Sequence, residues 1–328
     1  MKKIIILIIS IFCLTGCANY HELNELGIVS SILIDYKDNL FYTTVEIVDE
    51  EEFKTYSGVG NSLTNALDNT LIGSSKYLYY SHLNAVILSE NTPIDTTLNY
   101  FLRSPEINNT FYTCITEKTD IYNKDENIGE TLKNILERVY KDNSFNTIKK
   151  LKDKNTDFVL PIVDENLKVS KLNLYKNSKK VATLNNNEFN TLKLLFGHEN
   201  IFIKNGKEKY IEININKIKK KIDIKDKIKI SLDLEATIKQ ITTDEEANNI
   251  KDLQNIQGRY NEELENNIYE LIDKLKEYKT DVLGINNMLL NKFHNLDKHF
   301  YDYSFDIDVK THINKKGLLI KWKKNGIF

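Results

Sequence analysis

The first 17 residues constrain the chain most, because they decide where it folds and which cysteines it keeps. Two lysines precede a short apolar run, Ile4–Phe12, and the segment ends in Leu14-Thr15-Gly16-Cys17. A basic start, a short apolar stretch and small residues before a cleavage point are typical of a secretory signal peptide. The cysteine after the small residues makes this a lipobox. We therefore predict a leader over residues 1–16 and a diacylglyceryl group on Cys17, since two acyl chains hold a protein stably on a bilayer.

The alternative for this segment is an uncleaved transmembrane anchor. A spanning helix needs about 20 apolar residues, and Ile4–Phe12 is much shorter. The lipoprotein interpretation predicts a body tied to the outer face of a bacterial cytoplasmic membrane. In this interpretation, cleavage removes Cys13 with the leader and the lipid occupies Cys17, which leaves Cys114 without a cysteine partner. We expect no intramolecular disulfide, so the fold must be held by core packing.

Composition indicates an ordinary globular body with no nucleic-acid partner. The apolar content of 41% and the charged content of 28% are usual for such proteins. A net charge of −2 provides no basic field that would attract nucleic acid. With 328 residues, the chain is long enough for two or three domains.

Hydrophobic periodicity predicts an α+β fold of three packed domains, each with a mostly antiparallel or mixed sheet and helices. The predicted N-terminal, middle and C-terminal domains are residues 17–122, 123–204 and 205–328. No linker rich in Pro, Gly or Ser separates them, so we expect the domains to pack against one another.

Strand and helix signals are clearest at the two ends of the chain. Leu26–Asp35 and Leu40–Val48 are rich in β-branched and aromatic residues and predict a β-hairpin. A polar loop is expected over Asp49–Asn61, after which Ser62 caps a helix. Near the C-terminus, apolar residues recur every three or four positions from Ile250 to Leu275, which predicts the longest helix of the chain.

Several short motifs follow one another in an order that resembles one family. They are Glu22-Leu23, Ile32-Leu33-Ile34-Asp35, Tyr79-Tyr80-Ser81-His82-Leu83, Phe101-Leu102-Arg103-Ser104-Pro105-Glu106-Ile107 and Asp281-Val282-Leu283-Gly284-Ile285. Together with the lipobox, they make the chain similar to the Ger(x)C family, the lipoprotein C subunits of bacterial spore germinant receptors. Ala18-Asn19 replaces the Trp-Asp pair that the family tends to show, which indicates a divergent member.

The resemblance implies a receptor component and not an enzyme. Members of the family have three α+β domains and lie on the outer face of the spore's inner membrane, beside membrane-embedded A and B subunits. Germinant recognition is generally placed on those membrane partners. The resemblance therefore implies a part in nutrient-triggered germination together with A and B subunits, and it implies no cofactor.

Candidate site residues besides Cys17 are His82, Arg103, Pro105 and Glu106. Arg103 and Glu106 flank Pro105 just after a predicted helix. They predict either a local ion pair or turn cap, or a contact with another domain or subunit. His82 precedes an apolar strand and predicts a hydrogen-bonded structural histidine. No cysteine, histidine or carboxylate stands near it at the spacing of metal ligands.

Signals for other chemistries are weak. His294 and His299 are five residues apart and would not share a helix face, so we predict no zinc site. Asp49–Glu52 lacks the alternating ligands and the glycine of a calcium loop. Gly58-Val59-Gly60 lacks the third glycine and the Lys-Ser/Thr pair of a phosphate-binding loop.

Two other function classes are alternatives. A solute-binding lipoprotein of an import system would have two lobes of repeated βαβ units, whereas this sequence shows hairpins and alternating half-buried strands. An extracytoplasmic hydrolase acting on the cell wall would need a nucleophile or paired acids in a recognisable arrangement, and the sequence offers none.

Overall fold

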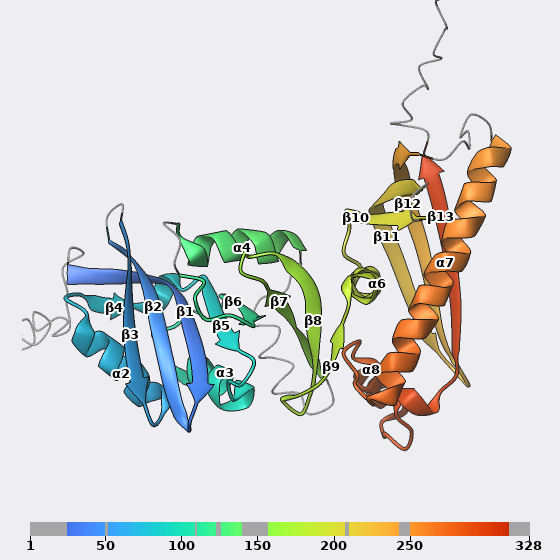
Figure 1. The fold of residues 1–328 in the computed structure, drawn as a ribbon. Helices are drawn as coiled ribbons and strands as arrows, with labels where there is room; N and C mark the ends of the chain where they lie inside the picture. The colour runs from blue at the N-terminus through green and yellow to red at the C-terminus, as the bar shows by residue number, and fades with distance from the viewer. Residues whose placement is uncertain are drawn as a thin grey trace, which may run out of the picture.

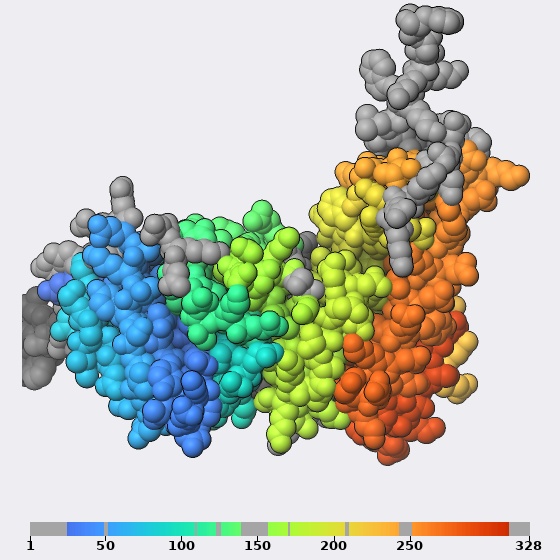
Figure 2. All heavy atoms as spheres, viewed as in Figure 1, coloured from blue at the N-terminus to red at the C-terminus, as the bar shows by residue number. Residues whose placement is uncertain are grey.

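The computed structural model describes residues 25–49, 52–108, 110–122, 126–139, 157–206, 210–242 and 250–314. In this part of the chain, two β-sheets lie at opposite ends of an elongated molecule, and helices pack on both (Figures 1 and 2). The α+β class predicted from the sequence is confirmed. The leader and Cys17 lie outside the described residues.

The first sheet is mixed and has nine strands. Its order is β3-β2-β1-β5-β6-β7-β8-β9, and β4 pairs in parallel with the start of β1. The strands are β1 (Leu26–Lys37), β2 (Leu40–Asp49), β3 (Glu52–Gly60), β4 (Tyr77–Tyr79), β5 (Ala85–Ser89), β6 (Tyr112–Thr116), β7 (Phe158–Val163), β8 (Val169–Lys176) and β9 (Lys179–Leu184). The central strands β1, β5, β6 and β7 are parallel, and antiparallel strands flank them on both sides.

The expected hairpin is present as β1 and β2. The prediction of a polar loop over Asp49–Asn61 is wrong, because most of this segment forms β3, antiparallel to β2. The reason lies in the glycines of this segment, which let a helix lie directly on the strand. A Cβ atom on Gly58 would stand 2.2 Å from the carbonyl oxygen of Ala66, and one on Gly60 would stand 2.4 Å from the Ala66 nitrogen. These glycines serve close packing.

Helices cover both faces of the first sheet (Figure 1). They are α2 (Leu63–Gly73), α3 (Ile94–Arg103), α4 (Ile128–Val139) and the short 3₁₀ helix η2 (Tyr80–His82). Helices α2 and α3 share an apolar core with one face of the sheet, and α4 forms a smaller core with the opposite face. Ser62 caps α2 as predicted, since the Asn65 N–H donates to Ser62 Oγ at 3.1 Å.

The second sheet has four strands in the order β10-β11-β12-β13. They are β10 (Ile201–Asn205), β11 (Ile211–Ile224), β12 (Ile228–Ile241) and β13 (Phe305–Asn314), and β13 runs parallel to β12. The remaining helices are α6 (Asn186–Phe196), α7 (Ile250–Glu277), α8 (Ile285–Phe293) and η3 (Phe300–Asp302). The long helix predicted over Ile250–Leu275 is confirmed as α7, which lies along the second sheet (Figure 1).

Side chains of α7 occupy the outer edge of β13. The four side chains recur every four residues: Gln257, Asn261, Glu265 and Tyr269. The N–H groups of Ile307, Val309 and Thr311 donate to Tyr269 Oη at 3.1 Å, Glu265 Oε1 at 2.9 Å and Asn261 Oδ1 at 2.9 Å. Gln257 Nε2 donates to the Thr311 carbonyl at 2.8 Å. The match is geometric, because four helical residues rise about 6 Å and two strand residues about 6.6 Å.

The sheets do not follow the three predicted domains one by one. Strands β1 to β6 belong to predicted domain 17–122, and β7 to β9 belong to 123–204, yet all of them lie in the first sheet. The two are joined because β7 is fully buried and pairs in parallel with β6. Around α6, apolar residues of β7, β8 and the second sheet form one continuous core. The domain boundaries stay predictions.

No helix among the described residues combines the length and the apolar character that a bilayer crossing requires.

Candidate functional site: a tyrosine-lined cleft

Two sequence motifs come together beside the first sheet. Tyr79-Tyr80-Ser81-His82-Leu83 forms the end of β4 and η2, while Phe101–Ile107 forms the end of α3 and the turn after it. Phe101 and Ile107 are buried in the core. Ser81 Oγ donates to the backbone carbonyl of Glu106 at 3.3 Å, which holds the two motifs in contact.

An open cleft of about 810 Å³ lies at this contact. Its lining consists of four tyrosines, four leucines, one serine and two acids. They are Tyr77, Tyr79, Tyr80, Tyr100, Leu26, Leu67, Leu71, Leu78, Ser81, Asp68 and Glu106. These described lining residues include no lysine, arginine or histidine. The size falls in the range of about 300–1,000 Å³ that is usual for small-molecule sites.

The two acids act electrostatically on the tyrosines at the base of the cleft. Burial raises the pKa of the Tyr80 hydroxyl well above its ordinary value, and Tyr100, Asp68 and Glu106 raise it further. The pKa of Tyr100 is also raised, first by burial, with a hydrogen bond from Ser104 opposing and the same two carboxylates adding to the shift. Both phenols therefore stay neutral at physiological pH, and both rings lie in the field of two negative charges.

Three polar side chains of the cleft, those of Asp68, Tyr80 and Glu106, are the ones that could meet a ligand. Within the described part of the chain, neither Asp68 nor Glu106 forms an ion pair, and the Tyr80 hydroxyl makes no hydrogen bond. At the mouth, Tyr77 and Tyr79 are 53% and 41% exposed. The cleft therefore presents aromatic rings and carboxylates to solvent.

Of the predicted site residues, Glu106 lines this cleft, whereas His82, Arg103 and Pro105 are not among its described lining residues. All four are exposed. In the described residues, Arg103 and Glu106 form no ion pair with each other. The turn cap and the contact with another domain or subunit stay predictions. The hydrogen-bonded role expected for His82 is not observed there either: its exposed ring lies 6.0 Å from the Tyr79 ring, between centroids.

The tyrosine cluster and Asp68 were not predicted. The run Tyr77-Leu78-Tyr79-Tyr80 is a signal that could have been used, since three tyrosines in four residues are too many for one buried face of a short strand. Asp68 carries no such signal. Its approach to Tyr80 and Tyr100 depends on how α2 and α3 pack on the sheet, and spacing along the chain does not show that.

A buried carboxylate lies on the first sheet, at the start of α4. Glu46 of β2 is 1% exposed. The N–H groups of Ile128 and Gly129 donate to its two oxygens at 2.7 and 2.9 Å, and Ser31 Oγ donates at 2.8 Å. Burial raises the pKa of Glu46, and these hydrogen bonds oppose the rise. A Cβ atom on Gly129 would stand 2.3 Å from the Ser30 carbonyl oxygen, so only glycine fits this approach.

A second buried carboxylate lies at the start of α8, in the Asp281–Ile285 motif. The N–H groups of Ile285 and Asn286 donate to Asp281 at 2.9 and 2.7 Å, and the Asp281 N–H donates to Asp157 at 2.8 Å. Burial raises the pKa of Asp281 to about 6, while these backbone bonds oppose the rise and the charge of Asp157 adds to it. Helix starts suit a carboxylate, because their first N–H groups lack helical partners.

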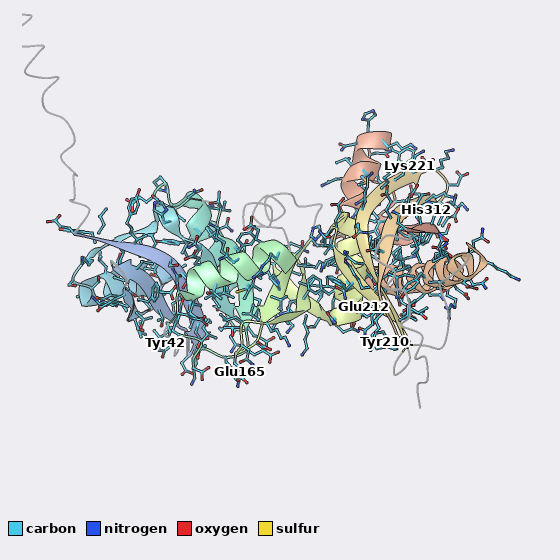
Figure 3. All side chains as sticks on the ribbon, turned by 90° about the horizontal axis from the view of Figure 1, so that it is seen from above. Tyr42, Glu165, Tyr210, Glu212, Lys221 and His312 are labelled. Carbon is cyan, nitrogen blue, oxygen red and sulfur yellow. The ribbon has the colours of Figure 1, made fainter. Side chains whose placement is uncertain are left out.

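Other reactive groups are few among the described residues. No three His, Cys, Asp or Glu side chains there gather in a way that could hold a metal ion. Cys114 is buried in β6, and burial raises the pKa of its thiol to about 12. A thiol that stays protonated is a poor nucleophile. Figure 3 labels Tyr42 and Glu165 in the part with the first sheet and His312 in the part with the second sheet.

Comparison with known proteins decides the family. A family model described as "Spore germination protein N-terminal domain" matches residues 19–165, and one described as "Spore germination B3/GerAC like, C-terminal" matches residues 170–317. The chain belongs to the Ger(x)C family of spore germination proteins. The two Ger(x)C matches meet between β7 and β8, inside the first sheet, so the family division also differs from the division into sheets.

Individual relatives agree with this assignment. The chain is 27% identical over 144 residues to spore germination protein KC of Bacillus subtilis (strain 168), a match that covers 39% of this chain and 35% of that protein. Its fold is similar to the crystal structure of the GerBC protein, with a TM-score of 0.58 and 18% sequence identity over 86% of this chain and 96% of that one. At this identity the structural likeness shows the fold alone. Membership of the germinant receptor C-subunit family supports a role in spore germination.

Proposed function

We propose that the chain is a non-catalytic, lipid-anchored subunit of a spore germinant receptor. It would act in nutrient-triggered germination together with membrane-embedded A and B subunits, on the outer face of the spore's inner membrane. The observation that carries this proposal is the pair of family matches, which together span most of residues 19–317. The lipobox at Leu14–Cys17 supplies the anchor.

The start of β1 supports a position of the cleft near the membrane. Leu26 lines the cleft and stands nine residues after Cys17. Nine extended residues span at most about 30 Å, so an acyl group on Cys17 would keep the cleft close to the membrane surface. The second sheet lies at the far end of the molecule (Figure 1). Confinement to the membrane raises the effective concentration of the subunit near membrane partners.

A non-catalytic role is supported by what the buried acids do. Glu46 and Asp281 accept backbone N–H groups at helix starts, and neither lines the cleft. These are structural duties, which do not require a substrate. The mixed first sheet, with antiparallel strands on both flanks, also differs from the repeated βαβ lobes of a solute-binding lipoprotein.

Replacing Cys17 by alanine tests the anchor. Cys17→Ala should block acylation, so the chain should not incorporate radiolabelled palmitate. It should also keep its leader and fail to support germination. Cys13→Ala is the matched control, because this leader cysteine lies four residues earlier and outside the lipobox. Normal acylation of Cys17→Ala would rule the anchor out.

Co-purification tests the subunit assignment separately from the anchor. Affinity-tagged chain solubilised from spore membranes should bring down the A and B subunits. Spores that lack the chain should fail to respond to the germinant of that receptor. Normal germination without the chain would contradict the proposed role, whatever the state of Cys17.

A further inference from the structure

The charge of the cleft favours a cation. Asp68 on α2 and Glu106 after α3 line it from two different elements, and the described lining residues contribute no positive charge. Both carboxylates raise the pKa of Tyr80, the first residue of η2, which also lines the cleft, so their fields converge on one place. An anionic ligand would be repelled by both acids.

The aromatic rings add a second reason. Tyr77, Tyr79, Tyr80 and Tyr100 surround the same space. The face of a tyrosine ring attracts an ammonium group, and a neutral phenol also accepts a hydrogen bond from it. In the described part of the chain, no lysine or arginine stacks on the ring of Tyr80 or Tyr100.

The leucines define the remainder of the ligand. Leu26, Leu67, Leu71 and Leu78 make part of the lining apolar. A cleft of about 810 Å³ holds far more than an ammonium ion. The bound group therefore needs an apolar body as well as a charge.

We propose that this cleft is a binding site for an organic ammonium group attached to an apolar body. The acids hold the charge, the tyrosine rings cover it and the leucines pack against the body. Two sources share this chemistry: a free ammonium compound, and a lysine side chain of a protein that docks at the cleft. The inference goes beyond the proposed function, and it does not depend on the lipid anchor.

Three matched probes test the proposal on the full chain purified in detergent. Benzylammonium carries the charge, benzyl alcohol is its neutral counterpart and benzoate its anionic one. Saturation-transfer difference NMR should show benzylammonium binding at least about ten-fold more tightly than benzyl alcohol, and no binding of benzoate. Raising the salt concentration should weaken the binding of benzylammonium and leave benzyl alcohol unchanged.

Variants locate the site. The double variant Asp68→Asn/Glu106→Gln should lose about ten-fold in affinity for benzylammonium, with no change for benzyl alcohol. Glu126→Gln is the matched control, an exposed acid near the start of α4. Tyr79→Leu should weaken benzylammonium about three-fold, whereas Tyr79→Phe keeps the ring and should not.

A lysine probe separates the two sources. Nα-acetyl-lysine amide that binds with the same dependence on Asp68 and Glu106 indicates a protein side chain as the natural ligand. Binding of benzylammonium without binding of the lysine probe indicates a free compound. Equal binding of benzylammonium and benzyl alcohol, no binding of either ammonium probe, or an unchanged affinity in the double variant would overturn the proposal. None of these results bears on whether Cys17 is acylated.

Discussion

Glu46 and Asp281 both cap the start of a helix, one in each half of the molecule. They differ in how far along the chain they lie from the N–H groups that they accept. Each is a buried carboxylate that accepts two N–H groups at the start of a helix. Asp281 lies four and five residues before its donors, within one turn of chain. Glu46 lies 82 and 83 residues before its donors, on a strand that must first be placed in the sheet.

The difference shows that the same kind of helix cap can fix a short local segment or join two distant parts of the fold. The Asp281 cap can form as soon as its own short segment turns, so it defines the start of α8. The Glu46 cap exists only when β2 and α4 are both in place, and it therefore ties α4 to the sheet. Contacts between residues far apart in sequence close long loops and form late.

The largest expected effect follows from Glu46→Ala. The change leaves the N–H groups of Ile128 and Gly129 buried without an acceptor and removes the partner of Ser31. We expect the free energy of unfolding to fall by about 3–5 kcal/mol, measured by chemical denaturation. Glu46→Gln, which keeps one acceptor oxygen, should lose about half of that. Equal stability of Glu46→Ala and the unaltered protein would break the comparison.

Asp281→Ala should have a smaller effect. It also leaves two N–H groups without their acceptor, but the turn is local and can adjust to let water reach them. A loss of about 2–3 kcal/mol in the free energy of unfolding is expected. Hydrogen exchange should show faster opening at α8 and no change at α4. Faster exchange at α4 would mean that the two caps are coupled.

The pKa of Asp281 predicts a pH dependence. Its folded value, about 6, lies above the ordinary 3.8, so folding favours the protonated form. The stability from this group is fully present below about pH 4 and is lost as the pH rises through about 6. Relative to Asp281→Asn, which cannot ionise, the unaltered protein should therefore lose on the order of 1 kcal/mol between about pH 5 and pH 7. Parallel stability curves for the two proteins would contradict the raised pKa.

The smallest effect is expected for Ser62→Ala. Ser62 also caps a helix, α2, but it is exposed, so water replaces the lost hydrogen bond to the Asn65 N–H. The free energy of unfolding should fall by only about 0.5–1 kcal/mol. A loss as large as that of Asp281→Ala would show that burial does not set the order of these three caps.

The sequence predicted the local features of the fold and missed most of the distant ones. Ser62 was recognised as a cap because it stands directly before a helical pattern, and its donor lies three residues later. The Asp281–Ile285 turn was recognised as a motif of the family, without the cap that Asp281 forms. Glu46 was not, because a single acid in a strand pattern gives no sign of a helix start 82 residues away. The strand β3 was missed because its glycines and polar residues look like a loop until α2 is placed on them.

The candidate site shows the same limit. The motifs that contain Tyr79 and Glu106 were noted separately, each from its own residues. Their contact through Ser81, and the arrival of Asp68 from α2, arise from tertiary packing. The chain has 18 tyrosines, and a count alone does not show that four of them share one cleft.

The side chains of α7 that cover the edge of β13 affect how neighbouring molecules can associate. An open strand edge invites pairing with another chain. At this edge, three N–H groups and one carbonyl of β13 are already hydrogen-bonded to side chains of α7, so they are not open to a second copy of the chain. Neighbouring molecules can then lie close together on a surface without strand pairing between their second sheets along β13.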